Sequence, residues 1–323
     1  MPRSPERILF LQNESVLQAQ TDVVERHLTA AFPRAHVVCA DRPDRVPEDV
    51  FQAVIAPTLP WLPEALARIK GCEWVHFLSA GVERIWEMPV DWSRLTLTKS
   101  SGIHGPQMSE YAIGALLHFC KGFDRYIEQS RTHAWQRAWQ DELSGQTLMV
   151  LGGGAIGAMV GQRARVFGMQ VIAVKRRPEP QGWADMTLDF DAARAHLGVV
   201  NALVVCVPLT DATQGMVNHA LLSSLAPGAV LVDISRGGVV EPEAVLDLLD
   251  SGHLRGAALD VFETEPLPED SPLWNRADVL LTPHVSGTSP HYLERALQLF
   301  IDNARHWQTD QRMITLVDQT ARY

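Results

Sequence analysis

Three residues in the second half of the chain have side chains suited to anion binding and proton transfer. Arg236 follows the apolar run 229–233 and precedes two glycines, which gives its planar guanidinium room to reach into a cleft. His284 follows the run 279–282, and an imidazole that titrates near neutrality can give a proton to a substrate oxygen and take it back. Glu265 lies in an acidic segment between them, where a carboxylate next to a histidine would orient the ring.

Their positions favour a shared site, because ligands of doubly wound α/β folds bind at the carboxyl ends of parallel strands. Each residue also has a purely structural interpretation. Arg236 could be a surface arginine that caps the next helix, and His284 could be a structural loop histidine. Glu265 precedes a proline and could belong to a solvated turn, so its catalytic role depends on a histidine partner.

A glycine-rich turn near the middle of the chain indicates a dinucleotide site. The apolar run 147–151 leads directly into the sequence G-G-G-A-I-G at 152–157, and a helical pattern follows. In a G-x-G-x-x-G turn the first glycine permits the tight turn, the second lets the pyrophosphate approach the backbone, and the third lets the helix pack on the strand. The positive N-terminal end of the helix then faces the phosphates. The predicted cofactor-binding residues of this turn are Gly152, Gly154, Ala155, Ile156 and Gly157. The alternative is an ordinary strand-to-helix turn.

The end of the next apolar run, 171–174, bears on the choice of cofactor. A site selective for NAD usually has an Asp or Glu about 20 residues after the glycines, to bind the ribose hydroxyls. Here the run is followed by Lys175, Arg176 and Arg177, whose charges suit the 2′-phosphate of NADP. We therefore predict a preference for NADP(H), with NAD(H) as the second cofactor. A solvated basic loop is the other interpretation.

Together these residues fit an enzyme that reduces a 2-keto acid with a nicotinamide cofactor. Such an enzyme needs a cation for the substrate carboxylate and carbonyl, an acid to protonate the developing alkoxide, and a rigidly held cofactor. Arg236, His284 and the glycine turn would meet these three needs.

Composition excludes several other classes of function. The formal net charge of −10 disfavours binding to nucleic acid or to anionic membranes. The four cysteines are far apart and form no C-x-x-C pair, so we expect reduced thiols, no metal site and a cytoplasmic protein. The apolar run near the N-terminus is too short for a secretory signal, and no run approaches the roughly 18–20 residues of a membrane span.

Apolar runs alternate with amphipathic segments along all 323 residues, a length typical of two domains. This pattern predicts an α/β fold with two doubly wound parallel-sheet domains. The cofactor domain would be a Rossmann domain, residues 102–287, inserted in a flavodoxin-like substrate domain, residues 1–101 and 288–323. The predicted strands are 8–11, 37–39, 53–56, 74–78, 147–151, 171–174, 202–206, 229–233, 256–260 and 279–282. Helices are expected at 64–70, 106–122, 243–250 and 291–307, the second of which could cross between the domains.

The motifs, taken in order, resemble those of the D-isomer-specific 2-hydroxyacid dehydrogenases. The matching segments are G-G-G-A-I-G at 152–157, S-R-G-G at 235–238, D-V-F-E-T-E-P-L-P at 260–268 and T-P-H at 282–284. The resemblance implies that Arg236 binds the keto acid, that His284 is the acid and base, and that Glu265 assists it. It also implies that Asp260 contacts the nicotinamide side of the cofactor.

Further roles follow from the same resemblance. The segment 78–82 looks like the substrate loop of the family, in which backbone N–H groups at Ala80 and Gly81 would hold the substrate carboxylate. The segment 102–111 resembles the glyoxylate/hydroxypyruvate reductase A branch, so the implied substrate is a small 2-keto acid, reduced to the D-2-hydroxy acid. A homodimer formed through the cofactor domains is also implied. The residues expected to line the cofactor cleft are Val207, Pro208, Ile234 and Ser235.

Trp135 and Trp139 are spaced to share a helical face. They could form a dimer contact, or they could belong to local core packing. Two other functions remain as alternatives. One is a dinucleotide-sensing protein, like the corepressors that share the fold, and the other is a formate or phosphite dehydrogenase. Retention of Arg236, Glu265 and His284 together favours catalysis on a keto acid.

Overall fold

The computed structural model describes residues 5–320, which divide into two compact units. Unit 1 contains residues up to Ile103 together with those from Ser289 onward, and unit 2 is His104–Thr288. Within residues 5–320, no helix combines the length and apolarity that a membrane crossing requires.

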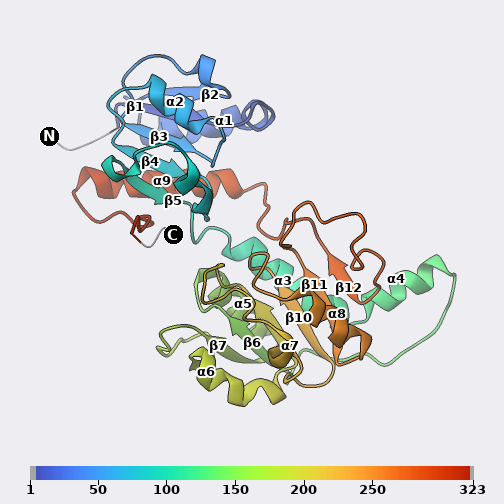
Figure 1. Cartoon of the computed structure of the whole chain (residues 1–323). Coiled ribbons are helices and arrows are strands. Elements are labelled where there is room, and N and C mark those ends of the chain that lie inside the picture. The colour runs from blue at the N-terminus through green and yellow to red at the C-terminus, as the bar shows by residue number, and fades with distance from the viewer. Residues whose placement is uncertain (1–4, 321–323) are drawn as a thin grey trace. The chain divides into compact units, whose positions relative to one another are not determined.

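Unit 1 is built on a five-stranded parallel sheet in the order β2-β1-β3-β4-β5 (Figure 1). The strands are β1 Arg7–Leu11, β2 His36–Ala40, β3 Ala53–Ala56, β4 Trp74–Phe77 and β5 Thr96–Lys99. This is the flavodoxin-like strand order, with the first strand inside the sheet. The helices of the unit are α1 Glu14–Ala31, α2 Leu62–Arg68 and α9 Tyr292–Gln308.

Strand side chains alternate between the two faces of this sheet, and each face has its own core. Ile8 and Phe10 of β1 pack with α1 and α9, where Phe300 stacks on the Trp74 indole with ring centroids 4.4 Å apart. Leu9 and Leu11 face the opposite core, which α2 covers. The helix α9 belongs to this unit although it comes last in sequence, because its apolar stripe completes the first core.

Unit 2 is built on a seven-stranded parallel sheet in the order β12-β11-β10-β9-β6-β7-β8. Its strands are β6 Thr147–Leu151, β7 Gln170–Val174, β8 Met186–Leu188, β9 Ala202–Val205, β10 Ala229–Asp233, β11 Leu254–Leu259 and β12 Val279–Leu281. Strand order reverses between β6 and β9, which is the topological switch point where Rossmann domains bind their dinucleotide.

Helices cover both faces of this second sheet. One core contains the inward sides of α3 and α5, and the other contains those of α7 and α8. The helices are α3 Gly105–Cys120, α4 Phe123–Arg131, α5 Ala155–Val166, α6 Phe190–Ala193, α7 His219–Leu222 and α8 Pro242–Asp250.

The predicted fold class of two doubly wound parallel-sheet domains is confirmed. Two strands were missed for a physical reason: β5 has the sequence T-L-T-K, without an apolar run, and β8 has only 3 residues. The helix predicted at 106–122 is α3, and it lies wholly within unit 2.

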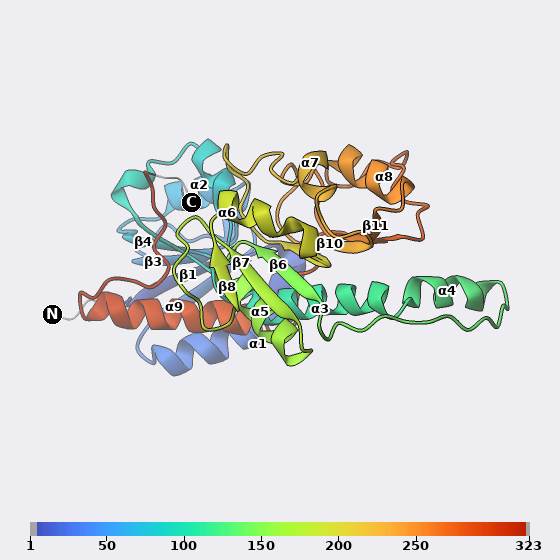
Figure 2. The same ribbon diagram turned by 90° about the horizontal axis from the view of Figure 1, so that it is seen from below.

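An arm of residues 121–146 extends from the end of α3 (Figures 1 and 2). It consists of α4 and a segment that folds back along it, with the Gln140 side chain donating to the Tyr126 hydroxyl at 2.6 Å. The expectation that Trp135 and Trp139 share a helical face is wrong, because α4 ends at Arg131. Local core packing is also excluded, since the two tryptophans are 95% and 100% exposed.

Candidate active site

The three predicted catalytic residues follow three neighbouring strands of unit 2. Arg236 comes after β10, Glu265 after β11 and His284 after β12, and these strands are adjacent in the order β12-β11-β10. All are parallel, so the three connecting turns leave the sheet at the same edge. Topology thereby brings together residues that are widely spaced in the sequence.

His284 and Glu265 form a direct pair. The imidazole Nδ1 lies 2.9 Å from Glu265 Oε2, and the other carboxylate oxygen accepts the Phe262 backbone N–H at 3.0 Å. Because both carboxylate oxygens are engaged, Glu265 has a fixed orientation and fixes the imidazole ring in turn. The pair leaves Nε2 as the ring nitrogen available to a substrate.

The backbone at His284 has a φ of 53°, in the left-handed region that non-glycine residues seldom occupy. The turn around it is held by Asp260, the residue that follows β11. The Asp260 carbonyl accepts the His284 N–H at 2.9 Å. Its carboxylate accepts the backbone N–H groups of Val285 at 2.8 Å and Ser286 at 2.9 Å. Asp260 is fully buried, so these bonds replace the water that the carboxylate loses.

Arg236 is presented by a short turn that Asp233 stabilises. Asp233 Oδ1 accepts the backbone N–H of Ser235 at 3.0 Å and its hydroxyl at 2.5 Å. One guanidinium nitrogen of Arg236 donates to the Ser235 carbonyl at 2.7 Å. Arg236 forms no ion pair with any carboxylate in residues 5–320, which leaves its charge for an anionic ligand.

Gly237 joins this turn to the loop that carries Glu265. A Cβ atom at Gly237 would stand 2.1 Å from the carbonyl oxygen of Phe262, the residue whose N–H binds Glu265. Only glycine permits this approach of the two backbones. Arg236 and the Glu265–His284 pair are therefore built on segments in direct contact.

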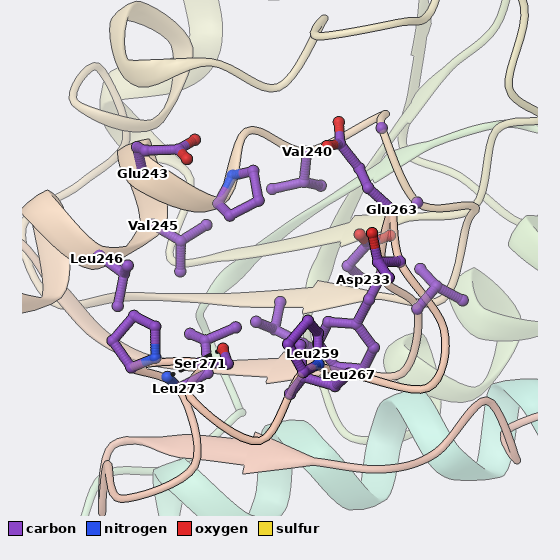
Figure 3. A pocket seen from close by; sticks show the side chains of 18 of the residues that line it. Asp233, Val240, Glu243, Val245, Leu246, Leu259, Glu263, Leu267, Ser271 and Leu273 are labelled. Atoms are coloured by element: carbon purple, nitrogen blue, oxygen red, sulfur yellow. Dashed lines mark hydrogen bonds between the residues drawn. The ribbon is translucent and has the colours of Figure 1, made fainter.

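Asp233 lies at one end of a cavity of about 360 Å³ between α8 and the loop after β11 (Figure 3). Glu263 lies near it at the same end, while Leu246 and Leu273 line the far side. Burial raises the pKa of Asp233 to about 7, and the nearby Asp260 charge adds to the rise, while hydrogen bonds from Ser235 oppose it. One of two buried acids below the site therefore keeps its proton up to neutral pH.

The glycine turn has the geometry that a pyrophosphate requires. Gly152 has a φ of 114°, and its Cβ would stand 2.8 Å from the Cys206 carbonyl oxygen and 3.0 Å from the Val207 nitrogen. At Gly157 a Cβ would stand 2.1 Å from the Gly152 carbonyl oxygen. At Gly154, in contrast, a Cβ would meet no atom of the described chain within 4 Å. The turn is closed toward the protein and open where the phosphates would approach, so it fits a dinucleotide.

The segments that follow β7, β9 and β10 complete the carboxyl edge of the sheet around the glycine turn. Gly152 and Gly153 both donate their N–H to the Val174 carbonyl at the end of β7, and a Cβ at Gly153 would contact the side chain of Lys175. Lys175 thus stands beside the glycine turn, and the exposed Arg176 follows it. In residues 5–320, Lys175, Arg176 and Arg177 form no ion pair with a carboxylate. Val207 and Pro208 follow β9, and Ile234 and Ser235 follow β10, as a cofactor cleft at the switch point requires.

Ala80 and Gly81 lie in unit 1, in the loop after β4. The start of this loop is rigid, because the Ser100 N–H donates to the carbonyls of Phe77 at 2.9 Å and Ser79 at 3.0 Å. Below it, His76 is fully buried between Thr98 and Ser100, and burial lowers its pKa to about 3, so the ring is neutral. The proposed role of Ala80 and Gly81 in substrate binding stays a prediction.

Comparison with known proteins identifies the family. Residues 113–286 match the sequence model of the D-isomer specific 2-hydroxyacid dehydrogenase, NAD binding domain. The chain belongs to the D-isomer-specific 2-hydroxyacid dehydrogenases. It is therefore an oxidoreductase, with a Rossmann domain for NAD or NADP.

Individual members of this family are similar over most of their length. A glyoxylate/hydroxypyruvate reductase A from Serratia proteamaculans is 32% identical over 272 residues, which are 80% of this chain and 83% of that protein. A family member of known structure from Aeromonas salmonicida subsp. salmonicida is 30% identical, with a TM-score of 0.85 over 97% of this chain and 99% of that chain. The structure of an NADPH-dependent glyoxylate/hydroxypyruvate reductase from Sinorhizobium meliloti, in complex with NADP and sulfate, is 26% identical. Its TM-score is 0.82 over 98% of this chain and 99% of that chain.

Sequence reasoning missed Asp233 and Ser286, although both help to build this candidate site. The signal for Asp233 is a carboxylate that ends an otherwise apolar strand, which indicates a buried polar function. Ser286 contributes a backbone N–H, and no pattern of side-chain types reveals a backbone donor.

The raised pKa of Asp233 makes stability depend on pH in a defined direction. The folded-state pKa of Asp233, near 7, exceeds its unfolded value of 3.8. The acid therefore contributes its full stabilisation of the folded state below pH 3.8, and this stabilisation is lost as the pH rises from 3.8 to about 7. Asp233→Asn has no ionisable group at this position, so the variant does not lose this stability as the pH rises. Relative to the wild type, the free energy of unfolding of the variant should rise by about 1.1 kcal/mol per pH unit on average between pH 5 and 7, because the full slope of about 1.4 kcal/mol falls to half at the folded-state pKa.

Urea denaturation at pH 5, 6, 7 and 8 measures this difference. Asp211→Asn, at an exposed carboxyl, is the matched control, and its difference from the wild type stays constant with pH. A constant difference for Asp233→Asn as well would show that Asp233 is ionised throughout.

Proposed function

We propose that this dehydrogenase reduces a small 2-keto acid such as glyoxylate or hydroxypyruvate to the D-2-hydroxy acid with NADPH. The proposal rests on one arrangement: the imidazole of His284 is bonded to Glu265, and the loop that carries Glu265 touches the turn that carries Arg236. No carboxylate of the described chain neutralises the charge of Arg236. The names of the Serratia and Sinorhizobium relatives support the choice of substrate.

Substrate binding is assigned to a cation and a backbone loop. Arg236 holds the carboxylate and polarises the keto oxygen, because a guanidinium offers several donors in one plane. In unit 1, the backbone N–H groups of Ala80 and Gly81 are proposed as carboxylate donors. Small residues suit this loop, since no large side chain obstructs the ligand.

Proton transfer is assigned to Nε2 of His284. As the keto carbon gains a hydride, which bound NADPH supplies, negative charge develops on the substrate oxygen, and Nε2 donates a proton to it. Glu265 accepts a hydrogen bond from Nδ1–H, so it keeps the ring oriented and leaves Nε2 for the substrate. In the oxidative direction Nε2 takes the proton back.

Initial rates with a panel of 2-keto acids test this function. We expect NADPH oxidation with glyoxylate and hydroxypyruvate, and a loss of about 100-fold or more in kcat for His284→Ala, because general acid catalysis contributes that much. His219→Ala, at an exposed histidine of the same unit, is the control and keeps wild-type rates. NADPH binding without any turnover would instead identify a dinucleotide sensor, and turnover of formate or phosphite would identify the other enzyme class.

The preference for NADPH is proposed from the basic segment beside the glycine turn. Lys175, Arg176 and Arg177 stand at the end of β7, where NAD-selective members of doubly wound folds place a carboxylate. A 2′-phosphate there gains charge-assisted hydrogen bonds, which NAD cannot make.

The double variant Arg176→Ala/Arg177→Ala tests this preference. Loss of a charge-assisted hydrogen bond costs about 1.5–3 kcal/mol, so we expect KM for NADPH to rise about tenfold or more. KM for NADH should change less than about twofold. The control is Arg194→Ala, an exposed arginine of the same unit that pairs with Asp191. Equal changes of KM for the two cofactors would exclude a 2′-phosphate site.

We also propose a homodimer, in which the arm of residues 121–146 packs on a second copy of this chain. Trp135 and Trp139 are almost fully exposed, and Phe123 and Ile127 of α4 are 51% and 49% exposed. Between α4 and the returning segment is a hollow of about 550 Å³, lined by Tyr126 and Trp135 among others. So much aromatic surface on one projecting segment is typical of an interface.

Trp135→Ala/Trp139→Ala tests the dimer. Buried tryptophans at interfaces contribute about 2 kcal/mol or more each, so the dimer dissociation constant should rise about 100-fold or more. Light scattering and sedimentation at micromolar concentrations measure it. Trp274→Ala removes a half-exposed indole elsewhere in unit 2 and leaves the mass unchanged. An unchanged dimer in the arm variant would refute this contact.

A further inference from the structure

Tyr111 lies on α3, outside the strand-end motifs, yet its hydroxyl reaches the segment that carries His284. Its Oη is 2.8 Å from Thr282 Oγ1, and Thr282 Oγ1 is 2.6 Å from Asp260 Oδ1. The same carboxylate accepts the N–H groups of Val285 and Ser286. A hydrogen-bonded chain thus runs from α3 through Thr282 and Asp260 to both residues that follow His284.

The direction of this chain follows from the donors available. Thr282 has one hydroxyl proton, and the Asp260 carboxylate, acting as acceptor, takes it. The Tyr111 hydroxyl must therefore donate to Thr282. Burial raises the pKa of Tyr111 to about 12, and the charges of Asp260 and Asp233 add to the rise. The hydroxyl keeps its proton at every pH at which the enzyme would be assayed.

The His284 turn needs such support. Its φ of 53° is unfavourable for a residue with a side chain, and the ring itself is about half exposed, with Glu265 as its bonded side-chain partner. What holds the backbone is Asp260, through its carbonyl and both carboxylate oxygens. Anything that fixes the Asp260 carboxylate therefore fixes the position of His284.

We propose that Tyr111 is a positioning residue for His284, which it holds in place through Thr282 and Asp260. This inference rests on the proposed function, in which His284 transfers the proton. The helix α3 packs against α5, β10 and β11, so Tyr111 connects a well-packed helix of the unit to the turn that carries His284. Loss of the hydroxyl leaves the ring packing in place and loosens only the chain of hydrogen bonds.

The expected kinetic effect separates proton transfer from substrate binding. Arg236 is held by a different turn, through Asp233 and Ser235, and the bonds that hold this turn do not involve the Thr282 hydroxyl. For Tyr111→Phe we expect the single-turnover rate of hydride transfer from NADPH to glyoxylate to fall about tenfold, and KM for glyoxylate to change less than about twofold. A loss of substrate binding alone would give the opposite pattern.

Variants of Thr282 test the chain at its second position. Thr282→Val removes the hydroxyl at nearly constant shape and should reproduce the tenfold loss, whereas Thr282→Ser keeps the hydroxyl and should keep the wild-type rate. The double variant Tyr111→Phe/Thr282→Val should be no slower than Thr282→Val alone, because both changes break one chain. Thr147→Val, at the opposite end of the same sheet, is the control for a buried threonine and leaves the rate unchanged.

Hydrogen exchange supplies a readout that needs no turnover. In Tyr111→Phe the amides of Val285 and Ser286 should exchange at least several-fold faster than in the wild type, while those of β6 do not change. The wild type could fail to reduce any keto acid while Tyr111→Phe still shows this faster exchange. That result would refute the proposed function and leave the support of the turn by Tyr111 intact. Tyr111→Phe with both the wild-type rate and wild-type exchange would overturn the inference. So would an equal loss of rate in Thr282→Ser and Thr282→Val, because the hydroxyl would then be irrelevant.

Discussion

The buried carboxylate of Asp260 is the interaction on which the catalytic end of unit 2 depends. A carboxylate without solvent exposure is stable only when hydrogen bonds replace its water, and here the donors are the Thr282 hydroxyl and two backbone N–H groups. These donors all lie in the segment 282–286, which contains His284. The need to satisfy one buried charge thus determines the conformation of the turn that carries the acid, and that turn places His284 against Glu265.

A second constraint is the absence of side chains where backbones meet. Gly237 lets the Arg236 turn lie on the Phe262 carbonyl, Gly152 lets the glycine turn lie on Cys206, and Gly157 lets α5 approach the end of β6. Each contact is closer than any Cβ would allow. All three glycines belong to the motifs, so these positions of the family's sequence signature have a steric cause in this structure.

Charge in unit 2 is distributed so that the cations at the carboxyl ends of its strands remain available to anionic ligands. The chain has a net charge of −10, yet Arg236, Lys175 and Arg176 form no ion pair with a carboxylate in residues 5–320. Other arginines of unit 2 are neutralised within the protein, for example Arg255 by Asp124 and Arg276 by Asp278. Unpaired cations in an acidic protein attract anions, and a keto acid and a nucleotide phosphate are both anions.

The sequence by itself determined the strand and helix periodicity, the glycine turn and the three polar residues that follow strands, Arg236, Glu265 and His284. These features are local, since each depends on the spacing of residue types within one segment. Tertiary structure alone decided the pairing of Tyr111 with Thr282, which are 171 residues apart, and the proton that Asp233 keeps near neutral pH. It also decided that Trp135 and Trp139 face solvent instead of a core. Hydrogen-bond partners and burial depend on which distant segments the fold brings together, and no local pattern of residue types contains that information.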